Sequence, residues 1–273
     1  MMSIDEYNQL RAVNYSTLKH MRKSPLAYRY ACDHHSEPTL AMLKGTATHV
    51  LTLEPENFDK HIAEWEGDRR GKAWEAFRDA NSTRAILRTS ELAESRAMAS
   101  AVRSDPYAMR YLTAPGRAAE VPMVWTDPGT GLKCKGRADL ICTIDDQPQV
   151  VGLKTTRDIA ETAFMWQAFR LGYHLQWAFY HDGYQAIHGH APRMVEIVVE
   201  SSPPHECVVY VIPDDVLAVG RDEYRALLSR VRECLDAGSW PGLGAEGERL
   251  FALPDRAYDM ADEIDLDGLD EVA

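Results

Sequence analysis

A short apolar run that ends in a lysine contains the residues best suited to chemistry. Val150, Val151 and Leu153 flank Gly152, and Lys154 follows them, a pattern typical of a buried strand. Because side chains alternate across a strand, residues 152 and 154 point to the same face. An acid at the first position would hold a divalent cation, and a lysine at the second would stabilise charge on an attacked phosphate. Gly152 has no side chain, so the sequence predicts such a site with one ligand missing.

Three more residues are placed to complete a metal site. Asp139, in the preceding predicted strand, can lie beside position 152, and Glu120 lies in the strand before that. His49, in a predicted helix rich in small residues, can reach the same edge of the sheet. Mg²⁺ retains several waters, so one or two carboxylates plus a backbone carbonyl can hold it. Taken singly, a helical histidine is usually a core residue and a strand acid usually lies on the surface, but their combination favours the metal site.

These residues belong to a predicted order of helices, then strands, then helices. Helices are predicted at about 14–21, 25–32, 40–53, 71–80, 89–104, 160–188 and 213–237. Strands are predicted at about 119–126, 134–144, 148–155, 194–201 and 206–212. No internal repeat or linker is visible. The pattern therefore predicts a single α/β domain over 1–256, with a helical N-terminal portion to about residue 115 and a core over about 116–243.

Composition describes an ordinary globular protein of 273 residues, 45% of them hydrophobic. No stretch approaches the roughly 20 apolar residues of a membrane span, and the N-terminus does not resemble a secretory signal. The five cysteines are scattered and form no C-x-x-C pair, which fits reduced thiols. We therefore expect a cytoplasmic protein without membrane association.

The net charge of −12 is unevenly distributed along the chain. Seven acids and no basic residue lie between Tyr258 and Ala273, so residues 257–273 are predicted to form a disordered acidic tail. Basic residues cluster early in the chain, at Arg11, Lys19, Arg22, Lys23, Arg29, Arg69, Arg70 and Lys72. These clusters are either solvated helix faces or a surface for a polyanion.

Several motifs in this order resemble the PD-(D/E)XK nuclease superfamily, and within it the RecE-type exonucleases of phages and prophages, which are similar to exonuclease VIII and lambda exonuclease. The resemblance covers roughly residues 7–243 and implies a mixed central sheet flanked by helices. It rests on His49 in Gly-Thr-Ala-Thr-His, Glu120, Gly-Arg-Ala-Asp139, Leu-Lys154-Thr-Thr, Gln176-x-x-x-Tyr180, the segments Asn14–Leu18 and Ser24–Tyr28, and Trp240-Pro-Gly.

The resemblance implies a processive 5′→3′ exonuclease that acts on double-stranded DNA ends and uses Mg²⁺ or Mn²⁺ at a two-metal site. By position, His49, Asp139 and the Leu153 carbonyl would be metal ligands, and Glu120 would bind or orient near the metal. Lys154 would stabilise the transition state. The side chains that would line the site are Gln176 and Tyr180.

The chain departs from the family at Gly152, where the family has Asp or Glu. We expect weaker metal binding than in a Gly152→Asp variant, and a rate loss of about 10²-fold or more, so the chain is predicted to be inactive or strongly impaired. Glycine is also a poor residue inside a strand, and no structural reason for it is evident from the sequence. Asp145 and Asp146 lie too far along the chain to substitute. The alternative is a catalytically dead DNA-binding or recombinase-docking protein.

The same resemblance predicts partners. The 3′ single strands left by the exonuclease would pass to a single-strand annealing protein of the RecT type. The chain would form a homo-oligomeric ring, a tetramer rather than a trimer, with a monomer as the alternative. Arg22, Lys23 and Arg29 are predicted to bind the phosphates at the DNA end, beside the helix start at Pro25, and Arg137 is a further candidate for DNA binding.

Overall fold

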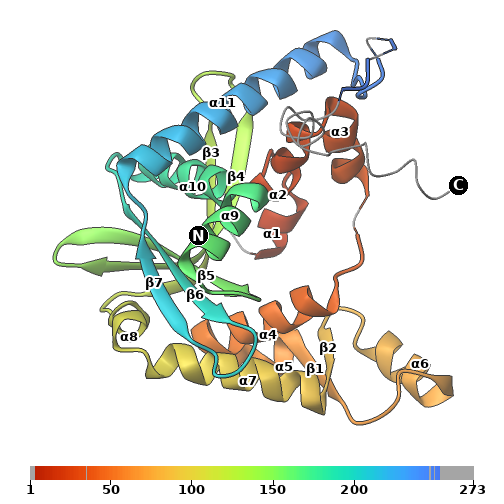
Figure 1. Ribbon diagram of the computed structural model, residues 1–273, viewed down its shortest axis with the longest axis vertical. Coiled ribbons are helices and arrows are strands. Elements are labelled where there is room, and N and C mark those ends of the chain that lie inside the picture. Colours follow the sequence, from red (N-terminus) through yellow and green to blue (C-terminus); the bar gives the residue numbers. More distant parts are fainter. Residues whose placement is uncertain (1–3, 35, 246, 249, 253–273) are drawn as a thin grey trace, which may run out of the picture.

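A five-stranded mixed sheet forms the centre of the computed structural model, which describes residues 4–34, 36–245, 247–248 and 250–252 (Figure 1). Its strand order is β3 (Ala118–Thr126), β4 (Lys133–Ile144), β5 (Gln147–Thr156), β6 (Arg193–Glu200) and β7 (Cys207–Val211). Only β5 and β6 are parallel; the other neighbours are antiparallel. The predicted α/β class, with a mixed central sheet flanked by helices, is confirmed.

The connections follow from local sequence. Asp145 and Asp146 both have positive φ, 51° and 61°, which suits the two-residue turn that joins β4 to β5 as a hairpin. The parallel pair β5–β6 needs a crossover, which α9 (Glu161–Leu171) and α10 (Tyr173–His188) supply. The predicted single helical region at 160–188 is wrong in one respect: Gly172, at φ 77°, ends one helix and begins the next.

Two layers of helices cover the sheet. One core contains Val150 of β5 and packs against α10 and α11 (Asp214–Ala237). The other contains Val151 and Leu153 and packs against α4 (Leu40–Leu53), α7 (Thr89–Ser104) and α8 (Pro106–Leu112). Successive β5 side chains therefore alternate between the layers. Gly152 and Lys154 are two and four residues after Val150, so they lie on the same face of β5, which is covered by α10.

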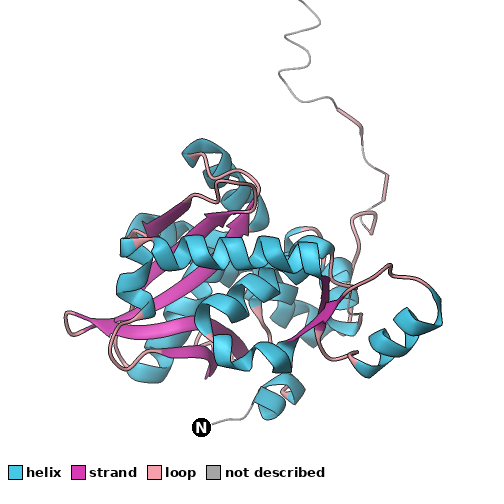
Figure 2. Cartoon of the chain, turned by 90° about the horizontal axis from the view of Figure 1, so that it is seen from below, coloured by secondary structure: helices cyan, strands magenta, loops and turns pink. Residues whose placement is uncertain are grey.

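The N-terminal portion is helical, as predicted, with α1 (Ile4–Gln9), α2 (Tyr15–Leu18), the 3₁₀ helix η1 (Lys19–Arg22) and α3 (Pro25–Asp33). After α4 come η2 (Pro55–Asn57), α5 (Phe58–His61) and α6 (Gly71–Ala80), and α6 extends away from the body of the molecule (Figure 2). A two-stranded parallel sheet of β1 (Ile62–Trp65) and β2 (Ala85–Arg88) was not predicted, nor were α1 and α8.

None of the helices that the structure describes is both long and apolar enough to span a bilayer. The predicted acidic tail of residues 257–273 lies outside the described residues.

Candidate metal centre

The site lies at a fork where β4 leaves β5. The pairing of β4 with β5 stops at Leu140 and Val151. Beyond this point the two strands separate, while β4 remains paired with β3 and β5 with β6. At the fork a side chain replaces the ladder, because Asp139 Oδ2 accepts a hydrogen bond of 2.9 Å from the Leu153 N–H. Asp139 is therefore held beside position 152, as predicted.

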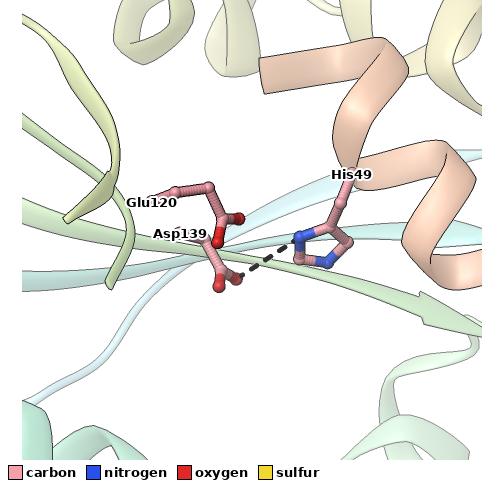
Figure 3. Close-up of side chains that lie close together, drawn as sticks. All are labelled: His49, Glu120 and Asp139. Atoms are coloured by element: carbon pink, nitrogen blue, oxygen red, sulfur yellow. Dashed lines mark ion pairs between the residues drawn. The ribbon is translucent and has the colours of Figure 1, made fainter. Parts of the chain in front are cut away.

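His49, Glu120 and Asp139 come together at this fork from α4, β3 and β4 (Figure 3). One potential ligand atom from each lies within 4.8 Å of the others. His49 Nδ1 is 3.9 Å from Asp139 Oδ2, and its Nε2 is 2.6 Å from the Leu153 carbonyl oxygen. Glu120 has φ 52°, a strained conformation that marks an irregularity in β3 next to the site. The structure thus gathers the residues that the resemblance assigns to the metal.

Charges in the fork are closely coupled. Burial raises the pKa of Glu120 to about 7, although Arg137 Nε, at 2.7 Å, opposes this shift. Burial also disfavours the charged form of Lys154, but the carboxylates of Glu196 and Asp139 outweigh it and raise the lysine pKa. Burial opposes ionisation of Asp139, yet Lys154 and His49 lower its pKa overall. An ionised carboxylate and a charged lysine are therefore stabilised side by side.

The Gln176-x-x-x-Tyr180 motif lies on α10 and covers the fork. Both side chains line a small cavity together with Asp139, Gly152 and Lys154. Tyr180 packs against Gly136 of β4, where an added Cβ would lie 2.8 Å from the tyrosine ring. Gly136 therefore allows the close approach that places this helix over the site.

A family profile described as "PDDEXK-like domain of unknown function (DUF3799)" matches residues 14–249. The chain belongs to the PDDEXK-like family. No functionally curated protein shows a significant sequence match to it.

Among solved structures, a "putative exonuclease" from Eubacterium rectale is similar to this PDDEXK-like chain, with a TM-score of 0.64 and 14% identity over 97% of this chain and 99% of that one. At this identity the likeness shows a shared fold. The proteins SSO0001 (TM-score 0.30, 15% identity, 78% and 86% covered) and VC1899 from Vibrio cholerae (0.21, 12%, 88% and 58%) are too distant to support an argument.

Gly152, which is predicted to stand where the family has an acid, has a structural explanation that the sequence did not reveal. It pairs with Glu196 on β6, and a Cβ at residue 152 would lie 2.7 Å from the Glu196 carboxyl carbon. The expectation that the structure offers no reason for glycine is wrong, because the carboxylate of Glu196 occupies the space of a side chain at 152.

Lys154 has acidic neighbours on this face although Gly152 offers none. Its Nζ lies 3.6 Å from Glu196 Oε1 and 3.7 Å from Asp139 Oδ2. Glu196 was missed because it stands inside the apolar run Met194–Val199. An acid within such a run was itself a usable signal, since a buried carboxylate needs a partner.

The residues predicted to bind DNA lie in different settings. Arg22 is bound to Glu223 (2.8 Å) and to carbonyl groups at the end of α9, and Arg29 pairs with Asp33. Arg137 pairs with Glu120 at the fork. Lys23 is exposed and has no ion pair within the described part of the chain. A groove of about 540 Å³ is lined by Lys19, His20, Arg22, Lys23, Phe169, Arg170 and Leu171.

This groove is connected to the fork through a short stretch of chain. Tyr15 donates a hydrogen bond of 2.7 Å to the Leu171 carbonyl. Tyr173, two residues further on, has its ring 5.6 Å below Lys154 Nζ.

The donor set at the fork fits a divalent cation of the Mg²⁺ or Mn²⁺ type. Glu120 and Asp139 offer carboxylate oxygens and Leu153 offers a carbonyl, which are the hard ligands that these ions prefer. His49 adds an imidazole nitrogen, which also suits a transition metal such as Mn²⁺. Because a carbonyl oxygen only accepts, His49 Nε2–H donates to the Leu153 carbonyl, which leaves Nδ1, the nitrogen that faces Asp139, as the one available to a metal.

Proposed function

We propose that the chain is a metal-dependent deoxyribonuclease that degrades double-stranded DNA from its ends in the 5′→3′ direction and leaves 3′ single strands. The observation that supports this most strongly is the convergence of His49, Glu120 and Asp139 beside Lys154 at the fork. Family membership supports a nuclease, and the structural neighbour named as an exonuclease agrees with it.

Each residue at the fork has a role in this proposal. His49, Asp139 and the Leu153 carbonyl hold the cation, and Glu120 binds it or orients the attacking water. A divalent cation there would polarise the phosphate and activate water. Lys154, held charged by its carboxylate neighbours, stabilises negative charge that develops on the phosphate. Gln176 and Tyr180 orient the substrate from α10.

The groove beside η1 and α9 is the proposed path of the DNA. Lys19, Lys23 and Arg170 line it, and such side chains bind phosphates without regard to sequence. Trp166 and Phe169 of α9 are 60% and 50% exposed. Exposed aromatic rings next to basic side chains are suited to stacking on unpaired bases.

Assembly and partners follow from the same proposal. A ring of identical subunits, with four favoured over three, would gather basic surface around DNA despite the net charge of −12. Its 3′ single strands would be used by a RecT-type annealing protein in homologous recombination, in the cytoplasm.

The test is digestion of linear duplex DNA labelled at either the 5′ or the 3′ end, with Mg²⁺ or Mn²⁺ and with chelator as a control. We expect early loss of the 5′ label and accumulation of 3′ single strands, abolished by Asp139→Asn. Early loss of the 3′ label would contradict the polarity, and internal cleavage would contradict an exonuclease.

The second candidate is a catalytically dead DNA-binding or recombinase-docking protein, which Gly152 favours. This candidate function predicts that the protein binds DNA but does not digest it, whichever divalent cation is added. The loss of nuclease activity predicted from Gly152 assumes that the metal site lacks a carboxylate. A neighbouring side chain that supplies this carboxylate would remove the reason for the loss.

A further inference from the structure

Glu196 and Gly152 are direct partners across the parallel strands β5 and β6. Side chains of paired residues in neighbouring strands lie on the same face, so Glu196 projects toward α10, as Lys154 does. All three atoms of its carboxylate lie within 2.7 Å of the position that a Cβ at residue 152 would take. The two residues form a complementary pair, in which glycine on one strand leaves room for the acid of the other.

One oxygen of the Glu196 carboxylate accepts a hydrogen bond and the other does not. Its Oε2 accepts a hydrogen bond from the Trp177 indole of α10. Its Oε1 is buried and has no hydrogen-bond partner among the described residues, with Lys154 Nζ at 3.6 Å. The residue as a whole is only 1% exposed. The ion pair with Lys154 leaves this buried oxygen without a hydrogen bond, and an unmet hydrogen bond in the interior is costly, so a further ligand at this point would be stabilising.

Glu196 lines a cavity of about 10 Å³ together with Asp139, Gly152, Lys154, Gln176, Tyr180, Trp177 and apolar β-strand residues. A space of this size corresponds to about one water molecule or one ion. Carboxylates from two strands, Asp139 and Glu196, therefore line one small cavity.

The balance of charges at the fork also supports a role for Glu196 in binding a cation. Without Glu196, the carboxylates of Glu120 and Asp139 are balanced by Lys154 and Arg137. Burial raises the pKa of Glu196, although Lys154 opposes this shift. When ionised, Glu196 adds the negative charge that the glycine at 152 removes, and a more negative cluster attracts a dication more strongly.

We propose that Glu196 is a metal ligand that takes the place of the acid missing at residue 152. The carboxylate has moved from β5 to the neighbouring strand β6, and Gly152 is the substitution that accommodates it. This inference rests on the proposed nuclease function for its biological meaning. The sequence predicted a metal site that lacks one carboxylate; with Glu196 as a ligand, the site has that carboxylate again.

The competing role for Glu196 is that of a counter-ion for Lys154 alone. That role makes Glu196 important for stability and for the lysine, but not for the affinity of the metal. The two roles are separated by measuring Mn²⁺ affinity and thermal stability on the same variants.

The experiment is calorimetric titration of the full chain with Mn²⁺, with thermal unfolding in the absence of metal. Glu196→Gln keeps the shape of the side chain and an acceptor for Trp177 while removing the charge. The matched control is Glu206→Gln, an exposed acid in the connection between β6 and β7. We expect Glu196→Gln to weaken Mn²⁺ binding at least about tenfold and the control to leave it unchanged.

A strand swap provides the sharper test. Gly152→Asp alone places two carboxylates in the space of one, so we expect a lower melting temperature and no tighter binding. Glu196→Ala alone should weaken Mn²⁺ binding as Glu196→Gln does. The double variant Gly152→Asp/Glu196→Ala returns the acid to β5 and should restore both stability and affinity toward those of the unmodified protein.

The outcomes separate this inference from the proposed function. Unchanged Mn²⁺ affinity in Glu196→Gln would overturn the ligand assignment even if its melting temperature falls, as would tighter binding in Gly152→Asp alone. No Mn²⁺ binding by the unmodified protein would overturn it as well. If the unmodified protein and the double variant bind Mn²⁺ as expected but digest no DNA, the nuclease proposal fails while Glu196 remains a ligand.

Discussion

His49 on α4 and Leu153 on β5 are in direct contact, with 2.6 Å between the imidazole Nε2 and the carbonyl oxygen. The contact joins residues 104 positions apart and fixes the helix against the strand at the fork. The other ring nitrogen faces Asp139. This imidazole therefore connects the backbone and carboxylate donors of the candidate metal centre.

The first prediction concerns this histidine. His49→Ala removes a nitrogen donor, so Mn²⁺ affinity measured by calorimetry should fall about 10- to 100-fold. His34→Ala serves as the control, because His34 is exposed and packs against Tyr30, away from the residues of the candidate metal centre. Equal affinities in the two variants would remove His49 from the ligand set.

Much of the fold could be predicted because hydrophobic periodicity reports directly on burial. All five strands of the main sheet were predicted to within about two residues, and α4 has the predicted bounds. The parallel pair β1–β2 was missed because each strand has four residues and α6 lies between them. Gly172 divides the long helical region because its positive φ cannot continue a helix.

The candidate site could also be predicted from the sequence only in part. His49, Glu120 and Asp139 could be placed together because sequential antiparallel strands and a recognisable motif order them. Glu196 could not, because the register of β6 against β5 is set after a crossover of two helices and no local pattern encodes it. A one-residue slip would turn this carboxylate to the other face.

The second prediction tests the packing that places α10. Gly220 of α11 touches the backbone of α10, and an added Cβ would lie 2.6 Å from the His174 carbonyl carbon. Backbone cannot move aside as a side chain does, so Gly220→Ala should lower the free energy of unfolding by about 1–2 kcal/mol despite better helix propensity. Gly244→Ala, with open space around it, should change it by less than about 0.5 kcal/mol. Urea unfolding of both variants measures the difference.

The third prediction concerns acid stability. Burial opposes ionisation of Asp182, but hydrogen bonds from His181, Arg221 and Tyr224 outweigh it and lower its pKa. The unfolded carboxyl titrates near about 3.9. The folded protein therefore gains stability from this group above that pH, and loses it as the pH falls from there through the folded pKa.

Asp182→Asn should accordingly cost about 2 kcal/mol of unfolding free energy near neutral pH, and the cost should shrink below about pH 4. Asp236→Asn is the control, since Asp236 pairs with Arg232 on an exposed helix face. A penalty that stays constant down to strongly acidic pH would contradict the shifted pKa.

The fourth prediction is the oligomeric state. If basic surface must surround DNA, light scattering at physiological salt should give about four times the chain mass of 30.7 kDa. A mass three times that of the chain would favour the trimer instead. A mass of one chain at micromolar concentration would exclude a ring.

The last prediction tests the groove as the DNA path. Lys19→Ala/Lys23→Ala removes two cations from its lining, whereas Arg22 and Arg29 are already engaged by carboxylates. Each phosphate contact contributes about 0.9 to the slope of log affinity against log salt concentration. The double variant should therefore bind duplex DNA more weakly at low salt and show a slope smaller by about 2.

A charge-matched control separates this effect from a general change in the electrostatic field. Arg70→Ala/Lys72→Ala makes the same change in net charge at the start of α6, which extends away from the body of the molecule (Figure 2). Its salt slope should match that of the unmodified protein. If both double variants lose the same affinity and slope, the groove cations act only through the overall field, and the DNA path must lie elsewhere.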